Sequence, residues 1–576
     1  MTATTRATKK SQYVPVSPWR AQLVVILVGL LFALLGWRLV SLQVLNTERG
    51  YEFLQDQGAA RHLRTAELPA WRGVIADRHG EPLAVSTPVV TLWAHPRRLA
   101  GSGRVEELAD ALGVDSAALQ ERLDRYRNKR FMYLRRHMVP ARARDVLQLR
   151  IDGVRGQREY QRYYPAGDVT AHLVGFTNVD DQGIEGMELA YNDWLKGTPG
   201  RKQVIKDLHG EVVREVGELE PASAGRDLTL SIDLRLQYLA HRELQRAAAL
   251  SGARAAAAVS LGGRTGVVLG LANYPVYNPN NRRGVSPSQT RNRAVIDSFE
   301  PGSTMKPLTV IAALESGHYS AVSVIDTSPG WIIVGRKTLV DPRNSGELDV
   351  AMILAKSSQV GITRIALQLD ENAVWSVFSR FGLGVAPGTG FPGESSGLLR
   401  HRERWRDIER VTLAFGYGLT VSPLQLAQVY GALADEGRLR PASLLRQRAE
   451  DLTSQQVVDP ALAREMVDIL RGVTDDSGTA RRARIEGYSV AGKTGTTRKV
   501  GAGGYAEDRH RALFAGIAPA SAPRLVTVVL IDEPEGERYG GGEVAAPVFS
   551  RITAGALRLL NVPPDLPAQQ QTGSNT

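Results

Sequence analysis

The 576-residue chain contains no cysteine. This absence excludes a disulfide framework, a thiol nucleophile and a cysteine-ligated zinc site. It does not identify the compartment, because an exported protein with a large enough core needs no disulfide. The apolar and charged fractions, 43% and 23%, are those of a globular protein. At this length we expect two or three domains.

Lysine is scarce, with 11 lysines among 71 basic residues. The arginines are scattered among acidic residues, and no basic stretch interleaved with aromatics accompanies the net charge of +11. We therefore predict no nucleic-acid binding. The excess positive charge is expected on a solvated surface that faces an anionic membrane or cell wall.

Acidic residues are missing from the start of the chain, where the first is Glu48. An uncharged apolar run covers 21–37, and apolar residues resume after Arg38. A helix over 21–45 is about 37 Å long, enough to cross about 30 Å of hydrocarbon. No small-x-small cleavage site follows, which disfavours a cleaved signal peptide. Because basic residues precede the run, we predict a cytoplasmic tail over 1–20, a transmembrane helix over 21–45 and an exported remainder.

The exported part changes character near residue 226. Short β-type runs alternate with charged helical stretches over 46–225, which predicts a β-rich domain. A second domain is expected over 226–562 and a disordered polar tail over 563–576. Because strands occur early and late in the second domain, we expect an α+β fold with one antiparallel sheet covered by helices. Its predicted strands are 228–232, 255–261, 267–272, 489–492, 512–516 and 524–531, with a long helix over 233–250.

Two short motifs carry the candidate chemistry. Ser303 and Lys306 are three residues apart behind a Pro-Gly pair that opens a helix, so they share one helical face. A serine hydroxyl needs a base, and lysine serves as one only when burial or a nearby cation makes it neutral. Lys493 begins an Ala-Gly-Lys-Thr-Gly-Thr-Thr segment that could supply that cation. Its glycine-rich strand edge would let a substrate lie along the backbone, with an N–H group at the developing oxyanion.

Two other patterns also match known motifs. Residues 487–494 fit a phosphate-binding loop, but such a loop must open a helix and the following Gly-Thr-Thr is a poor helix start. Residues 393–397 fit a nucleophile elbow around Ser395, but no β-type run precedes them. The histidines are scattered, so the pattern favours Ser/Lys over Ser/His chemistry.

These motifs and their order resemble those of the class B penicillin-binding proteins. The resemblance extends from the membrane span to about residue 550 and includes Arg72-Gly-Val-Ile-Ala-Asp77, Arg162-Tyr-Tyr-Pro165 and Gly183-Ile-Glu185-Gly186-Met-Glu188. The phrase His172-Leu-Val-Gly-Phe-Thr-Asn178 is similar to the division-specific, FtsI-type subgroup. The resemblance implies that 46–225 is a pedestal domain and that 226–562 is a transpeptidase domain with the serine β-lactamase-like fold.

The resemblance also implies roles for individual residues. Ser303 would be acylated, Lys306 would accept its proton, and Ser357 would shuttle protons between Lys306 and Lys493. The backbone N–H groups of Ser303 and Thr496 would form the oxyanion hole. Together with Lys493, the residues expected to bind the D-Ala-D-Ala stem are Gln359, Thr494, Gly495 and Thr496.

Gln359 departs from the family pattern. The family's Ser-x-Asn motif corresponds here to Ser357-Ser358-Gln359. Glutamine keeps the amide but displaces it by one methylene, which is enough to loosen a bidentate contact. We expect acylation to persist with an altered donor preference or β-lactam affinity, as in a specialised paralogue.

The implied reaction cross-links peptidoglycan by two-step acyl transfer without metal or cofactor. Implied ligands and partners are stem peptides, β-lactams, a polytopic membrane glycosyltransferase and other division proteins. Two alternatives remain open at this point. One is hydrolysis on the same fold, as a D,D-carboxypeptidase or β-lactam hydrolase. The other is a non-catalytic β-lactam sensor or division scaffold.

Overall fold

The computed structural model describes residues 17–43, 63–206, 212–501 and 504–567. It divides into two compact units, Met1–Pro69 with Thr198–Ser223 and Ala70–Gly197 with Ala224–Thr576. The region predicted as the pedestal therefore contributes to both units. The division at residue 225 stays a prediction.

The first unit contains helix α1 (Pro18–Gln43) and one small sheet. α1 is long and apolar enough to cross a membrane, and none of its most apolar stretch is buried. It begins three residues before the predicted start, while residues 44 and 45 and the tail over 1–16 lie outside the described residues. The sheet is antiparallel in the order β1-β8-β9, formed by β1 (Leu63–Leu68), β8 (Gly200–Lys206) and β9 (Val212–Glu220).

The second unit begins with a five-stranded sheet. Its path is β10-β2-β3-β4, and β5 also pairs with β3. Two of the charged stretches in this region form α4 (Val105–Leu112) and α5 (Ser116–Arg125), which share a small apolar core with the sheet. The strands are β2 (Ile75–Ala76), β3 (Pro82–Ala94), β4 (Met132–Met138), β5 (Val154–Tyr163) and β10 (Leu228–Thr229).

A buried ion cluster explains three of the family-like motifs in this part of the chain. Glu188 accepts from Nε of Arg72 and Nε of Arg162, each at 2.6 Å, and all three side chains are buried. Arg72 also donates to the side chain of Asn192 at 2.9 Å. One carboxylate thus compensates two guanidinium groups, so these residues hold distant segments together.

Glu188→Gln is expected to destabilise the protein by about 3–5 kcal/mol, because it leaves two buried guanidinium groups without their counter-ion. Asp152→Asn is the control, since its pair with Arg98 is largely exposed and should contribute under about 1 kcal/mol. Urea unfolding of both variants measures the difference, and equal losses would contradict a structural role for the cluster.

The early and late strands of the second domain form one antiparallel sheet in the order β12-β11-β21-β20-β19. This arrangement confirms the prediction that the sheet is completed late in the chain. β19 runs well beyond the predicted end at residue 492, and so carries the whole Lys-Thr-Gly motif. The strands are β11 (Ala255–Gly262), β12 (Val268–Tyr274), β19 (Ala491–Gly501), β20 (Gly504–Ala518) and β21 (Leu525–Asp532).

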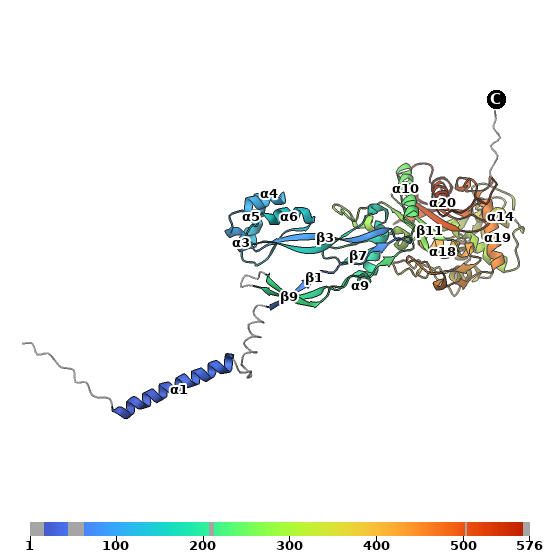
Figure 1. Ribbon diagram of the computed structural model, residues 1–576. Helices are drawn as coiled ribbons and strands as arrows, with labels where there is room; N and C mark the ends of the chain where they lie inside the picture. The colour runs from blue at the N-terminus through green and yellow to red at the C-terminus, as the bar shows by residue number, and fades with distance from the viewer. Residues whose placement is uncertain (1–16, 44–62, 207–211, 502–503, 568–576) are drawn as a thin grey trace, which may run out of the picture. The chain divides into compact units, whose positions relative to one another are not determined.

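Helices cover both faces of this sheet (Figure 1). α10 (Leu234–Ser251) contacts the face bearing Gly270, and α20 (Ala546–Leu559) packs Phe549 on Phe514 of the same face. α18 (Pro423–Ala434) contacts Leu261, which points to the other face. The central strands are therefore buried on both sides, and their sequences are almost continuously apolar.

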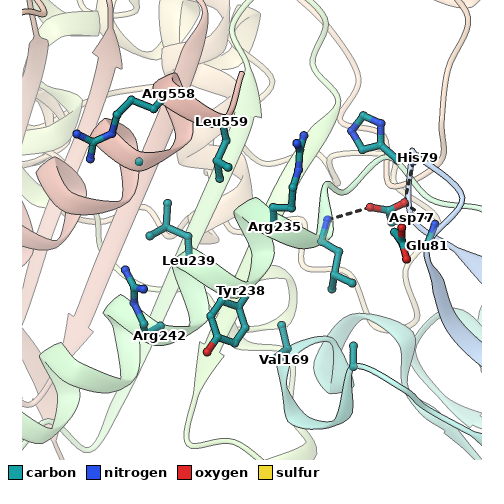
Figure 2. Close-up of a pocket in the computed structure, with 13 residues that line it drawn as sticks. Asp77, His79, Glu81, Val169, Arg235, Tyr238, Leu239, Arg242, Arg558 and Leu559 are labelled. Carbon is teal, nitrogen blue, oxygen red and sulfur yellow. Dashed lines mark hydrogen bonds between the residues drawn. The ribbon is translucent and has the colours of Figure 1, made fainter. Parts of the chain in front are cut away.

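A cavity of about 1120 Å³ lies where α10 and α20 meet the segment between β2 and β3 (Figure 2). Beside it, the carboxylate of Asp77 accepts from the backbone N–H of Leu234 at 3.0 Å and so ties β2 to the start of α10. None of the predicted site residues lines this cavity, so its size does not locate the candidate active site. Its lining is Asp77, His79, Glu81, Ala166, Val169, Leu234, Arg235, Tyr238, Leu239, Arg242, Gly555, Arg558 and Leu559.

The predicted disordered tail begins too early. Asp565 accepts from the backbone N–H of Ser489 at 2.8 Å and from the hydroxyl of Ser521 at 2.5 Å. The backbone N–H of Leu566 donates to Gly487. Low apolar content could not reveal these polar contacts. The remainder of the predicted tail, 568–576, lies outside the described residues.

Candidate active site

The segment that bears Ser303 is a tight turn that leads into a buried helix. A short 3-10 helix covers Gly302–Met305, and α13 (Lys306–Glu315) follows directly. In a 3-10 turn residues three apart are eclipsed, so Ser303 and Lys306 lie on the same side. Gly302 has φ +57°, and a Cβ there would lie 2.4 Å from Cγ2 of Thr497. Only glycine allows this close approach of the turn to β19.

Lys306 is buried, and its ammonium group lies against the turn that bears Ser357. Nζ donates to the backbone carbonyl of Ser357 at 2.6 Å and to its hydroxyl at 3.2 Å. Burial lowers the pKa of Lys306 to about 8, while the negative charge of Asp341 acts in the opposite direction. An amine with this pKa is partly neutral near physiological pH and is able to accept a proton.

Ser357 lies between two helices in a conformation that few non-glycine residues adopt. It ends α14 (Val350–Lys356) with φ +59°, and Ser358 then caps α15 (Gln359–Gln368) by accepting from the N–H of Gly361 at 2.9 Å. Left-handed backbone at a non-glycine residue is strained and is found mainly where surrounding contacts impose it. The strain keeps the Ser357 hydroxyl beside Lys306.

β19 forms the edge of the sheet next to the turn that bears Ser303. Lys493 is fully buried on it, while Thr496 is exposed. A Cβ at Gly495 would lie 3.0 Å from the carbonyl of Pro301, so β19 passes close to the Ser303 segment. The hydroxyl of Thr494 shares a hydrogen bond of 2.9 Å with Thr479. The motif therefore lies on an edge strand beside the Ser303 turn.

The two lysines lie close enough for their charges to interact. The pKa of Lys493 falls well below its usual value, first because the group is buried and second because the cation of Lys306 repels it. The expected influence therefore runs in the other direction: Lys306 lowers the pKa of Lys493, whereas burial is what lowers the pKa of Lys306. One of the two ammonium groups readily loses its proton, as two neighbouring cations repel each other.

Gln359 is the first residue of α15 and is partly exposed. Its backbone N–H donates to Asp341, and its carbonyl accepts from Thr363 at 2.7 Å. Among the described residues its carboxamide has no hydrogen-bond partner. The side chain is therefore available for a ligand.

The structure thus assembles the residues that the motifs predicted, from three separate stretches of chain. Two further polar residues contact them, Asp341 and Thr479, and no sequence pattern had singled out either. Residues 487–494 lead into β19 rather than a helix, so they form no phosphate-binding loop. Ser395 lies in a loop without a preceding strand, so it forms no nucleophile elbow.

Comparisons with known proteins agree with this arrangement. The chain matches the penicillin-binding protein transpeptidase domain over residues 256–554 and the penicillin-binding protein dimerisation domain over 67–230. It is 42% identical to the probable peptidoglycan D,D-transpeptidase PbpC of Pseudomonas aeruginosa, covering 95% of this chain and 96% of that protein. It is 41% identical to the peptidoglycan D,D-transpeptidase FtsI of Escherichia coli K12, covering 95% and 93%.

Solved structures are similar as well. Penicillin-binding protein 3 from Mycobacterium tuberculosis, in complex with aztreonam, is 27% identical with a TM-score of 0.67, over 87% of this chain and 99% of that chain. The transpeptidase domain of Burkholderia pseudomallei penicillin-binding protein 3 is 39% identical with a TM-score of 0.54, over 59% and 98%. The chain therefore belongs to the class B penicillin-binding proteins, among the FtsI-type peptidoglycan D,D-transpeptidases.

Proposed function

We propose that this protein cross-links peptidoglycan at the division septum through an acyl-enzyme on Ser303. The observation that carries the proposal is the position of Lys306, which is buried, bonded to Ser357, one turn from Ser303 and electrostatically coupled to Lys493. In the sequence, Ser303 is the only serine that lies three residues before a lysine, and Lys493 begins the only Lys-Thr-Gly.

The first half of the reaction uses Lys306 as the base. Neutral Lys306 takes the proton of the Ser303 hydroxyl as its oxygen attacks the penultimate D-Ala carbonyl. The oxyanion is stabilised by the backbone N–H groups of Ser303 and Thr496. The proton passes through Ser357 toward the departing D-Ala amine. Lys493 and Thr494 hold the terminal carboxylate, and Gly495 and Thr496 supply the strand edge along which the stem lies.

The second half transfers the acyl group to an amine of a neighbouring stem. The amine loses its proton to the same Ser357 and Lys306 path, the new amide forms, and the Ser303 ester breaks. β-Lactams would be attacked in the same way and would leave a stable ester. No step in this scheme calls for a metal or cofactor.

The membrane anchor sets where this chemistry occurs. The protein is a single-pass inner-membrane protein with α1 as its span. Arg6, Lys9, Lys10 and Arg20 precede or begin the span, which favours a cytoplasmic N-terminus and a periplasmic catalytic domain. A polytopic membrane glycosyltransferase and other division proteins would meet the span and the pedestal.

The competing functions predict different products. Incubation with a stem-peptide donor and an amine acceptor should give released D-Ala together with cross-linked dimer. Released D-Ala without dimer would indicate a carboxypeptidase. The absence of both products would indicate a non-catalytic scaffold. The comparisons lend no support to either alternative.

Gln359→Asn tests whether the longer amide sets ligand preference. Because the carboxamide moves by about one bond length, we expect acylation rates to change by about tenfold for some β-lactams and little for others. Second-order acylation rates for several β-lactams measure the effect. Identical rates for the native chain and the variant with every β-lactam would contradict a role for the longer Gln359 amide in ligand preference.

A further inference from the structure

Asp341 is a buried carboxylate that the reaction as described does not use. It follows β15 (Lys337–Val340), which pairs with β14 (Trp331–Val334) in a small hairpin. Its side chain is only 7% exposed, and its backbone N–H donates to the carbonyl of Gly330 at 2.8 Å. The hairpin therefore holds this acid rigidly inside the domain.

The carboxylate binds the end of the turn that carries Ser357. Its two oxygens accept from the hydroxyl of Ser358 and the backbone N–H of Gln359, and a third bond of 3.2 Å comes from the N–H of Val360. These donors include the first N–H groups of α15, which otherwise have no partner within the helix. An anion there is also favoured by the helix dipole.

The same charge acts on buried Lys306, whose protonated form it favours. Three sets of groups surround the ammonium of Lys306: the oxygens of Ser357 and Ser358 from the turn, Lys493 from β19 and Asp341 from the β15 loop. Asp341 therefore both caps α15 and acts on the charge of Lys306.

We infer that Asp341 is a positioning residue of the active site, which holds the strained Ser357 turn in place and offsets the charge of Lys306. The inference rests on the proposed function, in which Lys306 is the base. The β14–β15 hairpin would then affect the reactivity of Ser303, because it carries the acid that positions Ser357 and acts on Lys306.

Asp341→Asn separates the hydrogen bonds of Asp341 to the turn from the effect of its negative charge on Lys306. Asparagine keeps the size and most hydrogen bonds but removes the negative charge. Because that charge favours the protonated form of Lys306, its loss lowers the pKa of Lys306 below about 8. The rise of the acylation rate with pH should therefore move to lower pH, by about one unit.

The experiment measures the rate of Ser303 acylation by penicillin from pH 5.5 to 9 on the full-length protein in detergent. The control is Asp349→Asn, which removes the charge of a similar helix cap, a carboxylate that accepts from the N–H of Met352 in α14 and does not act on Lys306. We expect the control to leave the pH profile in place. An unshifted profile for folded Asp341→Asn would overturn the inference.

A second variant keeps the inference testable if Asp341→Asn does not fold. Asp341→Glu retains the charge but displaces the carboxylate by one methylene, so we expect a rate at least tenfold lower. A wild-type rate for Asp341→Glu would overturn the inference. Failure of the native protein to be acylated at any pH would instead contradict the proposed function itself.

Discussion

Ser303→Ala is expected to abolish the covalent penicillin adduct. Intact-protein mass spectrometry should show the native chain gaining the mass of one penicillin and the variant gaining none. Removing the nucleophile leaves only binding and oxyanion stabilisation, so acylation and cross-linking should fall by at least about 10³-fold. Because Ser303 is partly exposed, the substitution should leave the fold intact.

Ser395→Ala is the matched control for this experiment. Ser395 lies in the only other segment that resembles a serine-nucleophile motif, and the structure places it in a loop. Its adduct should form at the native rate. An adduct that persists in Ser303→Ala, or native protein that stays unmodified, would refute the assignment of the nucleophile.

Lys306→Arg is expected to have the second large effect. A guanidinium group stays protonated at any accessible pH and so is unable to accept the serine proton. Loss of a general base should lower the acylation rate by about 10²–10⁴-fold. In the native protein the rate should rise with pH and level off above about 8, since only the neutral form of Lys306 acts as base.

Lys356→Arg controls for the change of lysine to arginine. Lys356 is exposed at the end of α14, close in sequence to Ser357. Stopped-flow or fluorescent-penicillin assays of both variants, with melting temperatures to verify folding, measure the difference. Equal rates for native protein and Lys306→Arg would mean that another group takes the proton.

The elements that the sequence predicted well are those with strong periodic patterns. The apolar N-terminal run, the long helix α10 and the central strands β11 and β21 lie close to their predicted positions. The side chains of α10 are buried on one helical face and those of β11 and β21 on both faces of the sheet, while α1 is apolar on every face. Local hydrophobic pattern is then enough to identify them.

The elements that were misjudged depend on distant partners. β19 continues to Gly501 through polar residues, because β20 pairs with it along that length. The segment around Asp565 is ordered because Ser489 and Ser521 donate to it. Neither partner is near in sequence, so no local pattern reveals these contacts.

The sequence by itself determined the type of chemistry. With no cysteine and few lysines, a single Ser-x-x-Lys and a single Lys-Thr-Gly were enough to name Ser303, Lys306 and Lys493. Spacing alone placed Ser303 and Lys306 on one side of a helical turn, since local geometry depends only on neighbours along the chain.

Only the tertiary structure decided how those groups become reactive. The pKa shifts of Lys306 and Lys493 arise from burial, which depends on helices and strands folded over them from elsewhere in the chain. The acid that acts on Lys306, Asp341, follows a hairpin without any recognisable motif. Electrostatic environment is a property of three-dimensional packing, and the order of residues does not encode it locally.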